Sequence, residues 1–157
     1  MALTSTRLAD FLPYLLSVTS NAVSDSIAEE YRARFDLKIP EWRVMAVLGD
    51  AGEKTQRELA GATRMDKVAV NRACKILEER GLAARSPNAS DGRSHHLELT
   101  VEGKAMHAEI MPLALEMERR MFTALAPVER DQFKALLARI CDRATTLEAA
   151  DFAGNEG

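Results

Sequence analysis

Residues 55–82 read TQRELAGATRMDKVAVNRACKILEERGL, and this stretch decides the fold class. Thr55 and Glu58 have the spacing of a capping box, in which each side chain binds a backbone N–H of the other residue, so a helix should begin here. Asp66 predicts a second helix start, and Gly81 stands where a left-handed C-terminal cap is expected after Arg80. Residues 61–64 should form a tight turn. Two short helices joined by such a turn make a helix-turn-helix candidate.

The residues after this helix pair change to a strand pattern. Residues 82–86 can form a short strand, and residues 87–92, PNASDG, are turn formers. His95, Leu97 and Leu99 then alternate with polar residues, a period of two that fits a second strand. We therefore expect a β-hairpin behind the helix pair, which makes the unit a winged helix.

The flanking segments predict long helices. Apolar residues recur every three or four positions from 10 to 35, with Asp10 as the expected cap and Pro13 in the first turn. A second helix should run over 40–48 and end at the glycines 49 and 52. Thr100 should cap a helix over 101–124 that Pro112 kinks or breaks. A last helix should open at Pro127, and residues 149–157 should fray.

Composition excludes several classes of protein. A chain of 157 residues, 46% of them hydrophobic, is long enough for one compact domain. No apolar run approaches the roughly 20 residues of a membrane helix, and the N-terminus lacks a signal peptide, so we expect a soluble cytoplasmic protein without a membrane partner. Two cysteines give no disulfide framework or metal spacing, and 8 glycines with 5% aromatics disfavour an all-β fold.

The charge distribution says more than the net charge of −3. Residues 54–96 hold nine Lys and Arg against five Asp and Glu, a local charge of +4, so the rest of the chain carries −7. A basic block inside an acidic chain is typical of a confined site for a polyanion. Ordinary fluctuation of charge along the sequence would give the same count, so composition alone leaves both interpretations open.

The predicted helix over 66–80 has two different faces. Val70, Ala73, Cys74 and Leu77 share one arc at about 100° per residue and should be buried. The opposite arc carries basic and amide side chains that can address guanine and adenine in a DNA major groove, and a valine that can touch a thymine methyl. A solvated polar face is the alternative for a lone helix. The preceding capped helix and short turn favour the DNA interpretation.

The hairpin adds a second DNA contact. Arg93 stands beside a glycine at the tip, where a cation can reach an adjacent minor groove, and Asp91 can hold it in place. The alternative is an exposed turn pair worth at most about 1 kcal/mol. The full predicted DNA-binding set is Arg64, Lys67, Val68, Asn71, Arg72, Lys75, Asp91 and Arg93.

The wing sequence resembles that of a known family. Asp91-Gly-Arg93, followed by Leu97-Glu-Leu99-Thr100 and Gly103, is similar to the D-x-R…L-x-L-T-x-x-G signature of MarR-type regulators. The family likeness extends over residues 8–148, through Trp42-Arg43-Val44, Leu59-Ala60, residues 65–70 and residues 77–82. The resemblance implies a homodimeric winged helix-turn-helix transcription factor, usually a repressor, which a small molecule releases from its operator.

The resemblance also implies a division of labour within a single domain over residues 1–157. Residues 37–99 would form the DNA-binding lobe, and residues 8–36 and 101–148 would be dimerisation helices from both chain ends. The implied partners are double-stranded DNA, a second copy of the chain and a small effector, with no cofactor and no metal. The interface candidates are Phe11, Leu12, Leu15, Phe133, Leu137, Ile140 and Leu147. A core within the single chain is the alternative for these residues, and some of them should serve it as well.

Family ligands often lie between the dimerisation helices and the DNA-binding lobe. Here such a site would draw on Ser17, Asn21, Trp42, Arg43, Met45, His107 and Met111. Arg43 can pair with a carboxylate or phosphate, or hold a structural ion pair with a nearby Asp or Glu. Core packing is the more common role for the Trp and Met residues. Aromatic acids or coenzyme A thioesters are the effectors that family habit suggests.

Other constellations predict no further chemistry. His95 and His96 are adjacent on a strand, so they face opposite sides and cannot chelate together. Cys74 and Cys141 fall on apolar stripes and should be buried and inert, and no reactive cysteine lies near the N-terminus, as the peroxide-sensing branch of the family would require. No catalytic motif is present, so we expect no enzyme. A winged-helix module that binds proteins instead of DNA remains the alternative; it would place apolar or acidic residues on the outer helix face.

Overall fold

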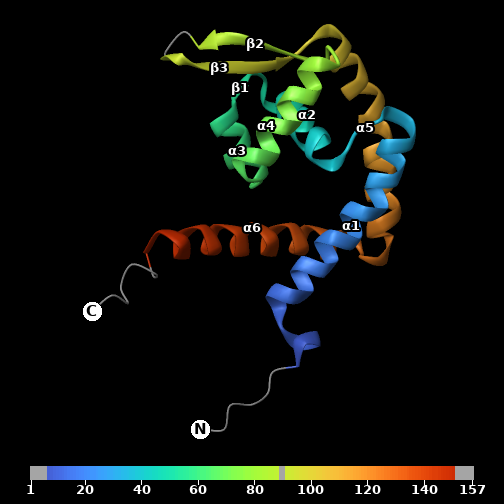
Figure 1. Ribbon diagram of the computed structural model, residues 1–157. Coiled ribbons are helices and arrows are strands. Elements are labelled where there is room, and N and C mark those ends of the chain that lie inside the picture. Colours follow the sequence, from blue (N-terminus) through green and yellow to red (C-terminus); the bar gives the residue numbers. More distant parts are fainter. Residues whose placement is uncertain (1–6, 89–90, 151–157) are drawn as a thin grey trace. The chain divides into compact units, whose positions relative to one another are not determined.

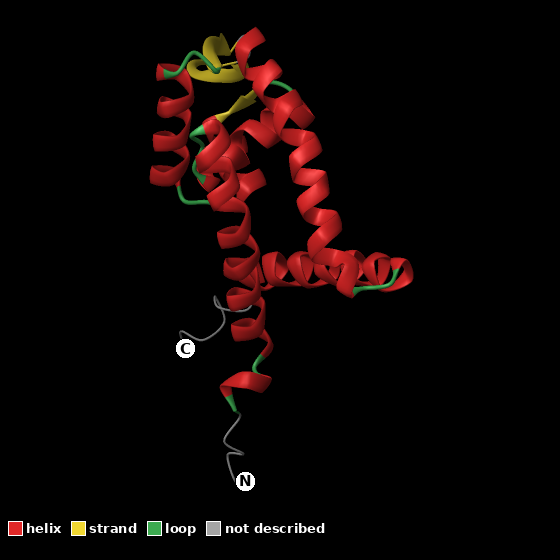
Figure 2. Ribbon diagram, turned by 90° about the vertical axis from the view of Figure 1, so that its right-hand side faces the viewer, coloured by secondary structure: helices red, strands yellow, loops and turns green. Residues whose placement is uncertain are grey.

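The computed structural model describes residues 7–88 and 91–150 and is mainly helical, with one small antiparallel sheet (Figure 1, Figure 2). This confirms the expected fold class. The elements in chain order are η1 (Leu8–Asp10), α1 (Leu12–Phe35), α2 (Ile39–Ala51), β1 (Lys54–Thr55), α3 (Gln56–Thr63), α4 (Lys67–Glu79), β2 (Ala83–Asn88), β3 (Asp91–Leu99), α5 (Val101–Met121), η2 (Phe122–Ala124) and α6 (Pro127–Ala150).

The chain divides into two compact units, and the boundary falls within α5, between Ala114 and Leu115. The first unit holds the elements from η1 to β3 and the first part of α5, and the second holds the rest of α5, η2 and α6. The predicted division by role, 37–99 against 8–36 and 101–148, stays a prediction. Of the tail expected to fray, residues 149–150 belong to α6, and residues 151–157 lie outside the described residues.

The wing is a three-stranded sheet in the order β1-β3-β2, and the sequence predicted only its hairpin. β2 and β3 pair antiparallel with Ala83 opposite Leu99, and Thr55 of β1 pairs with His96 on the other edge of β3. Leu97 and Leu99 are buried, as the alternation predicted. β1 has only two residues, which is too short for a period of two to be visible in the sequence.

Several helix ends differ from the prediction. α1 begins at Leu12 with Phe11 at the cap position and no side-chain cap, so Asp10, which ends η1, does not cap it. α2 continues beyond Leu48 to Ala51, and Gly52, at φ 76°, ends it. Gly49 lies inside α2, and its missing side chain makes room for a ring from α5: a Cβ there would overlap the imidazole of His107.

The turn between α3 and α4 is also shorter than predicted. α3 runs to Thr63, and the single residue Arg64, at φ 57°, takes the left-handed conformation that ends the helix. Pro112 lies inside α5 and does not break it; α5 ends at Met121, and residues 122–124 form a 3₁₀ turn. The predicted caps at Thr55, Asp66 and Thr100 are all confirmed by their hydrogen bonds.

The core of the first unit fills the space among α2, α3, α4 and the sheet. Its fully buried side chains come from the helices α1 to α5 and from the segment between α1 and α2: Tyr31, Leu37, Val44, Met45, Leu59, Val70, Cys74, Leu77 and Ile110. Tyr31 and Leu37 bring the end of α1 to this core, and Ile110 brings α5. The DNA-binding helix predicted from the sequence is thus held by an apolar face that is completely covered.

The start of α5 is fixed against the end of α4. The Thr100 hydroxyl donates to the Gly81 carbonyl (2.6 Å) and accepts from the Gly103 N–H (3.0 Å), while the Thr100 N–H donates to the Leu82 carbonyl (3.1 Å). Gly103 is buried directly on the Leu82 carbonyl, where a Cβ would overlap backbone atoms. Glycine is therefore needed at position 103 of the wing signature, because only a residue without a side chain lets the backbone of α5 lie this close to the backbone of Leu82.

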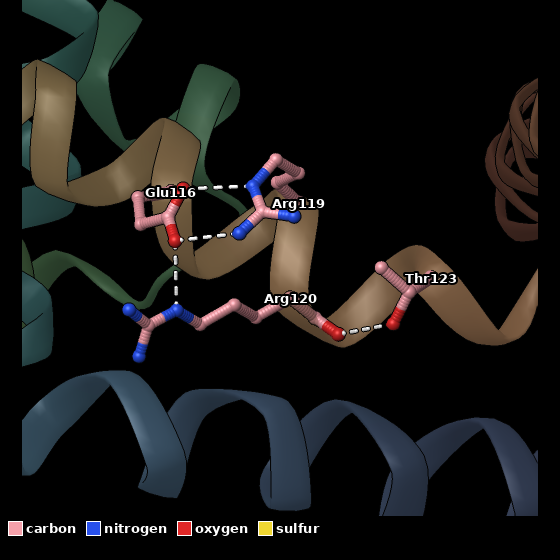
Figure 3. A network of polar contacts seen from close by, with 4 residues as sticks. All are labelled: Glu116, Arg119, Arg120 and Thr123. Atoms are coloured by element: carbon pink, nitrogen blue, oxygen red, sulfur yellow. Dashed lines mark hydrogen bonds and ion pairs between the residues drawn. The ribbon is translucent and has the colours of Figure 1, made fainter.

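The second unit carries a polar cluster and an exposed apolar stripe. Glu116 accepts hydrogen bonds from Arg119 and Arg120 (2.8 Å each) (Figure 3). These bonds, the one from Arg119 first, lower the pKa of Glu116 to about 2. Phe122 and Phe133 lie with their ring centroids 6.1 Å apart. Phe133, Leu136, Leu137 and Ile140 of α6 are all exposed.

A methyl group at Gly103 should destabilise the fold. Gly103→Ala should lower the free energy of unfolding by about 2 kcal/mol or more, because the Leu82 carbonyl belongs to backbone that cannot rotate away. Gly61→Ala is the matched control: Gly61 lies inside α3 with open space around it, so alanine should stabilise by up to about 1 kcal/mol. Urea titration followed by circular dichroism measures both, and equal stability of the Gly103→Ala variant and the parent would contradict the close-approach role.

Candidate nucleic-acid interface

α4 presents one covered face and one open face. The Asp66 carboxylate caps the helix by accepting from the Ala69 N–H (2.8 Å). Val70, Ala73, Cys74 and Leu77 are buried, as predicted. The outer face carries the remaining predicted residues of this helix, all of them exposed: Lys67, Val68, Asn71, Arg72 and Lys75. Val68 leaves 67% of its surface in water. A helix with cations, an amide and an exposed valine on its free side has the chemistry needed to contact base edges and phosphates.

Two cations of the basic block serve the fold instead. The guanidinium of Arg80 donates to the carbonyls of Asp36 (2.7 Å) and Phe35 (2.9 Å), which are the cap and the last residue of α1. Arg85 on β2 donates from Nε to the Glu78 carboxylate (2.6 Å), which ties the wing to α4. The charge count in the sequence could not separate these structural cations from the others, because their partners lie far away in the chain or across the sheet.

The wing and the start of α3 enclose a basic cleft. Arg57, Arg85 and Arg93 line it together with Thr55, Gln56, Ser94 and His95, and its volume is about 410 Å³. Arg93 is exposed on β3, as predicted, and Arg64 is exposed at the left-handed turn before α4. Asp91 begins β3, but its side chain lies outside what the structure describes, and so does its expected contact with Arg93.

The structure adds Gln56 and Arg57 to the candidate site. Both line a second cleft of about 590 Å³ with Lys67 and Val70, so they lie between the wing and the exposed face of α4. The Gln56 side chain donates from Nε2 to Asn71 Oδ1 (3.3 Å). Sequence reasoning counted Arg57 only as a charge and passed over Gln56. The capping box was the available signal, because it places both residues in the first turn of α3.

The two cysteines behave differently. Cys74 is buried, as predicted, and burial raises the pKa of its thiol to about 11, although the nearby charge of Arg85 opposes this shift. Cys141 was expected to be buried on the apolar stripe of α6, and this is wrong for the single chain, in which Cys141 is exposed. The sequence pattern identified a stripe correctly, but nothing in the described chain covers that part of α6.

The predicted ligand-site residues have different surroundings in the structure. Trp42 and His107 stack at 5.9 Å between ring centroids, and Tyr31 meets the edge of Trp42 at 5.2 Å. Arg43 is exposed and donates to the Ser24 hydroxyl (3.4 Å). Met45 is fully buried in the core. The remaining members are exposed on α1 or half-buried on α5: Ser17, Asn21 and Met111.

His107 also borders a small cleft of about 240 Å³ at the end of α2. The other residues that line this cleft are Leu48, Gly49, Gly52, Glu53, Glu98, Leu99 and Lys104. Within residues 7–88 and 91–150, no group of three His, Cys, Asp or Glu side chains could hold a metal ion. In the same ranges no helix is long and apolar enough to cross a membrane.

These observations define a class of protein. A capped helix, a three-residue turn, a second helix with an exposed basic face and a three-stranded wing together form a winged helix-turn-helix. The sequence profile of the MarR family matches residues 35–94, which include α2, α3, α4 and most of the wing.

Known proteins similar to the chain agree with this match. The transcriptional repressor IacR of Pseudomonas putida is 23% identical over 141 residues, 90% of this chain and 84% of the relative. A MarR family transcriptional regulator from Silicibacter pomeroyi is 28% identical, with a TM-score of 0.80 over 93% of this chain and 99% of that one. Bordetella bronchiseptica BpsR, whose DNA binding is regulated by 6-hydroxynicotinic acid, is 25% identical, with a TM-score of 0.74 over 83% and 98%.

Sequence profile, relatives and fold all show that the chain is similar to the MarR family of winged helix-turn-helix transcriptional regulators. The family resemblance inferred from the wing signature is thereby confirmed. The relatives are named as regulators of transcription, and this confirms the expectation that the chain is not an enzyme.

The buried thiol gives a prediction that involves pH. In a Cys141→Ser variant at pH 8, Cys74 should stay unlabelled by a thiol reagent until the protein is unfolded, because a pKa of about 11 leaves about one thiolate in a thousand. The folded state keeps its proton between pH 9 and 11 while the unfolded state loses it, so the stability that Cys74 contributes should be present below pH 9 and fall as pH rises toward 11.

Chemical unfolding from about pH 7 to about pH 10.5 measures this contribution. A variant with both Cys141→Ser and Cys74→Ala should lack the part of the alkaline decline that the thiol causes. Rapid labelling of Cys74 in the folded Cys141→Ser protein would contradict the prediction.

Proposed function

We propose that the chain is a sequence-specific transcriptional repressor that binds double-stranded DNA as a homodimer and that a small anionic ligand releases. The observation that carries the proposal is the outer face of α4, on which Lys67, Asn71, Arg72 and Lys75 are exposed while the opposite face is fully buried. A protein-binding module would place apolar or acidic residues on this face, and the single apolar residue there, Val68, stands among cations.

The residues of this face have different roles in the proposal. Arg72 and Asn71 lie at the middle of α4 and discriminate between bases, since a bidentate Arg favours guanine and a bidentate Asn favours adenine. Lys67, Lys75 and Arg64 neutralise phosphates, and Arg93 reaches a minor groove from the wing. Arg57 also neutralises a phosphate in this proposal, because it lines both clefts beside the first turn of α3.

Two arginine variants separate these roles. Arg72→Ala should cost about 1–3 kcal/mol of binding free energy on the preferred sequence and relax the preference at one position in each half-site. Arg93→Ala should weaken binding to all sequences and reduce the slope of log affinity against log salt by about one for each phosphate that the variant no longer neutralises. Binding to duplexes selected from a random library, titrated at several salt concentrations, measures both effects.

Arg34→Ala is the matched control for these variants, because Arg34 is exposed on α1 and paired with Glu30 (3.1 Å). It removes the same charge and should leave affinity and salt slope unchanged. An Arg93→Ala variant with the parent's affinity and salt slope would show that the wing does not contact DNA, and failure of the parent protein to enrich any sequence would refute the function.

The homodimer is supported by apolar surface at both ends of the chain. The first turns of α1 expose Leu12 at 74% and Phe11 at 48%, and α6 exposes Ile140 at 58% and Leu136 at 53%. Contiguous exposed apolar faces of this kind usually mark an interface. A second copy supplies the same faces about a two-fold axis, so the two α4 helices would enter successive major grooves about 34–36 Å apart on an imperfect palindrome.

A charge on the apolar stripe of α6 should separate the subunits. Ile140→Glu should shift the protein from dimer to monomer at micromolar concentration, because a carboxylate would be buried without a partner at the interface. Ala135→Glu adds the same residue to the opposite side of α6 and should leave the dimer intact. Sedimentation velocity measures the mass of each variant, and an Ile140→Glu protein that stays dimeric would place the interface elsewhere.

The proposed effector is a small aromatic acid or its thioester. BpsR, a relative of similar fold, responds to 6-hydroxynicotinic acid, which is an aromatic carboxylate. In this chain Arg43 is exposed and directly follows Trp42, whose ring stacks on His107, so the start of α2 carries a cation and aromatic side chains. A ligand there releases DNA only if it binds the DNA-incompetent conformation more tightly, with a coupling of about 1–3 kcal/mol. Such a regulator acts in the cytoplasm, where it has access to the DNA.

A further inference from the structure

Gln56 is the first residue of α3, and the residue before it, Thr55, is held by hydrogen bonds to α3 and by pairing in the sheet. Thr55, just before it, accepts from the Glu58 N–H (3.2 Å) and donates its own N–H to the Glu58 carboxylate (3.0 Å). Thr55 also pairs with His96 in the sheet. The side chain of Gln56 therefore starts from a point that is fixed relative to the helix and to the wing.

From that point the Gln56 side chain reaches the exposed face of α4. Its Nε2 donates a hydrogen bond to Asn71 Oδ1 at 3.3 Å, which connects the two helices of the helix-turn-helix across fifteen residues of sequence. Asn71 lies one helical turn from both Lys67 and Lys75 and is exposed. Gln56 is half-buried and lines both clefts beside α3.

In this hydrogen bond the oxygen of the Asn71 amide faces Gln56 and accepts from it. A primary amide has an acceptor oxygen on one side and a nitrogen with two donors on the other. Because Oδ1 faces the Gln56 donor, Nδ2 points away from α3. Without that partner the amide could turn by half a rotation and exchange donor for acceptor on the open face.

The outward group determines which base edge fits. A donor matches the N7 and O6 acceptors of guanine, the N7 of adenine and the O4 of thymine, whereas an acceptor matches the amino groups of cytosine and adenine. Oδ1 keeps one lone pair, while Nδ2 faces outward. The orientation of this amide thus decides which groups on a base edge it can meet in the major groove.

We propose that Gln56 is a positioning residue that determines base specificity: it holds the Asn71 amide so that Asn71 donates to an acceptor on a base edge in the major groove. The inference rests on the proposed function, because it needs α4 to bind DNA. Gln56 itself touches no base in this proposal and acts through Asn71.

The test is selection from a randomised double-stranded DNA library with the full-length chain and four variants. Asn71→Ala identifies the position at which Asn71 acts, since preference should disappear there and persist elsewhere. Gln56→Ala should reduce the preference at that same position by about three- to tenfold, because the amide can then present either end. Gln56→Glu should change the preferred base, because a carboxylate accepts from Nδ2 and turns Oδ1 outward, toward the amino groups of cytosine or adenine.

Arg57→Gln is the matched control for the charge of Gln56→Glu. It changes the net charge by the same amount at the neighbouring residue, and it should lower affinity for all sequences while the preferred bases stay the same. Circular dichroism and thermal unfolding confirm that each variant is folded. These readouts separate positioning from general support of the fold, which would weaken binding without changing the base at one position.

Three outcomes overturn the inference, and they are distinguishable. If the parent chain enriches a motif and both Gln56 variants enrich it with unchanged preference, Gln56 does not orient Asn71. If Asn71→Ala leaves every position unchanged, Asn71 is not a base contact. If the parent chain enriches no motif, the proposed function fails and this inference fails with it.

Discussion

Four elements meet where the chain leaves α4, at residues 80–82. Gly81, at φ 68°, closes the helix in a Schellman arrangement, with its N–H on the Glu78 carbonyl and the Leu82 N–H on the Leu77 carbonyl. Arg80 binds the end of α1, Thr100 binds the Gly81 carbonyl, and Gly103 packs on the carbonyl of Leu82. The candidate recognition helix is therefore joined through backbone groups to α1, β2 and α5. These contacts fix the C-terminal end of α4, and they therefore set the direction in which its exposed face points within the first unit.

Local signals in the sequence predicted most of this architecture. Thr55, Asp66, Thr100 and Gly81 act on backbone groups within three or four residues, so their roles can be recognised without the fold. The features that were missed depend on distant partners or on very short segments. β1 consists of two residues, and the ring of His107 from α5 occupies the space where a Cβ of Gly49 would lie.

The candidate site shows the same limit. Helical periodicity separated the two faces of α4 correctly, because burial follows from rotation about one axis. Counting charges was less informative, since Arg80 and Arg85 have partners in α1 and α4 that no short-range pattern reveals. Gln56 was missed for the same reason: its role depends on Asn71, fifteen residues away. Cys141 was assigned to a buried stripe, but nothing in the described part of the chain covers it.

The contact between Arg80 and α1 has a chemical consequence of its own. The planar guanidinium carries several N–H donors in a fixed arrangement, and here it spans two successive carbonyls at once. The single ammonium group of a lysine does not match this geometry. The attachment of α4 to the end of α1 therefore depends on the shape of the arginine side chain as well as on its charge, and a lysine at this position would not replace it.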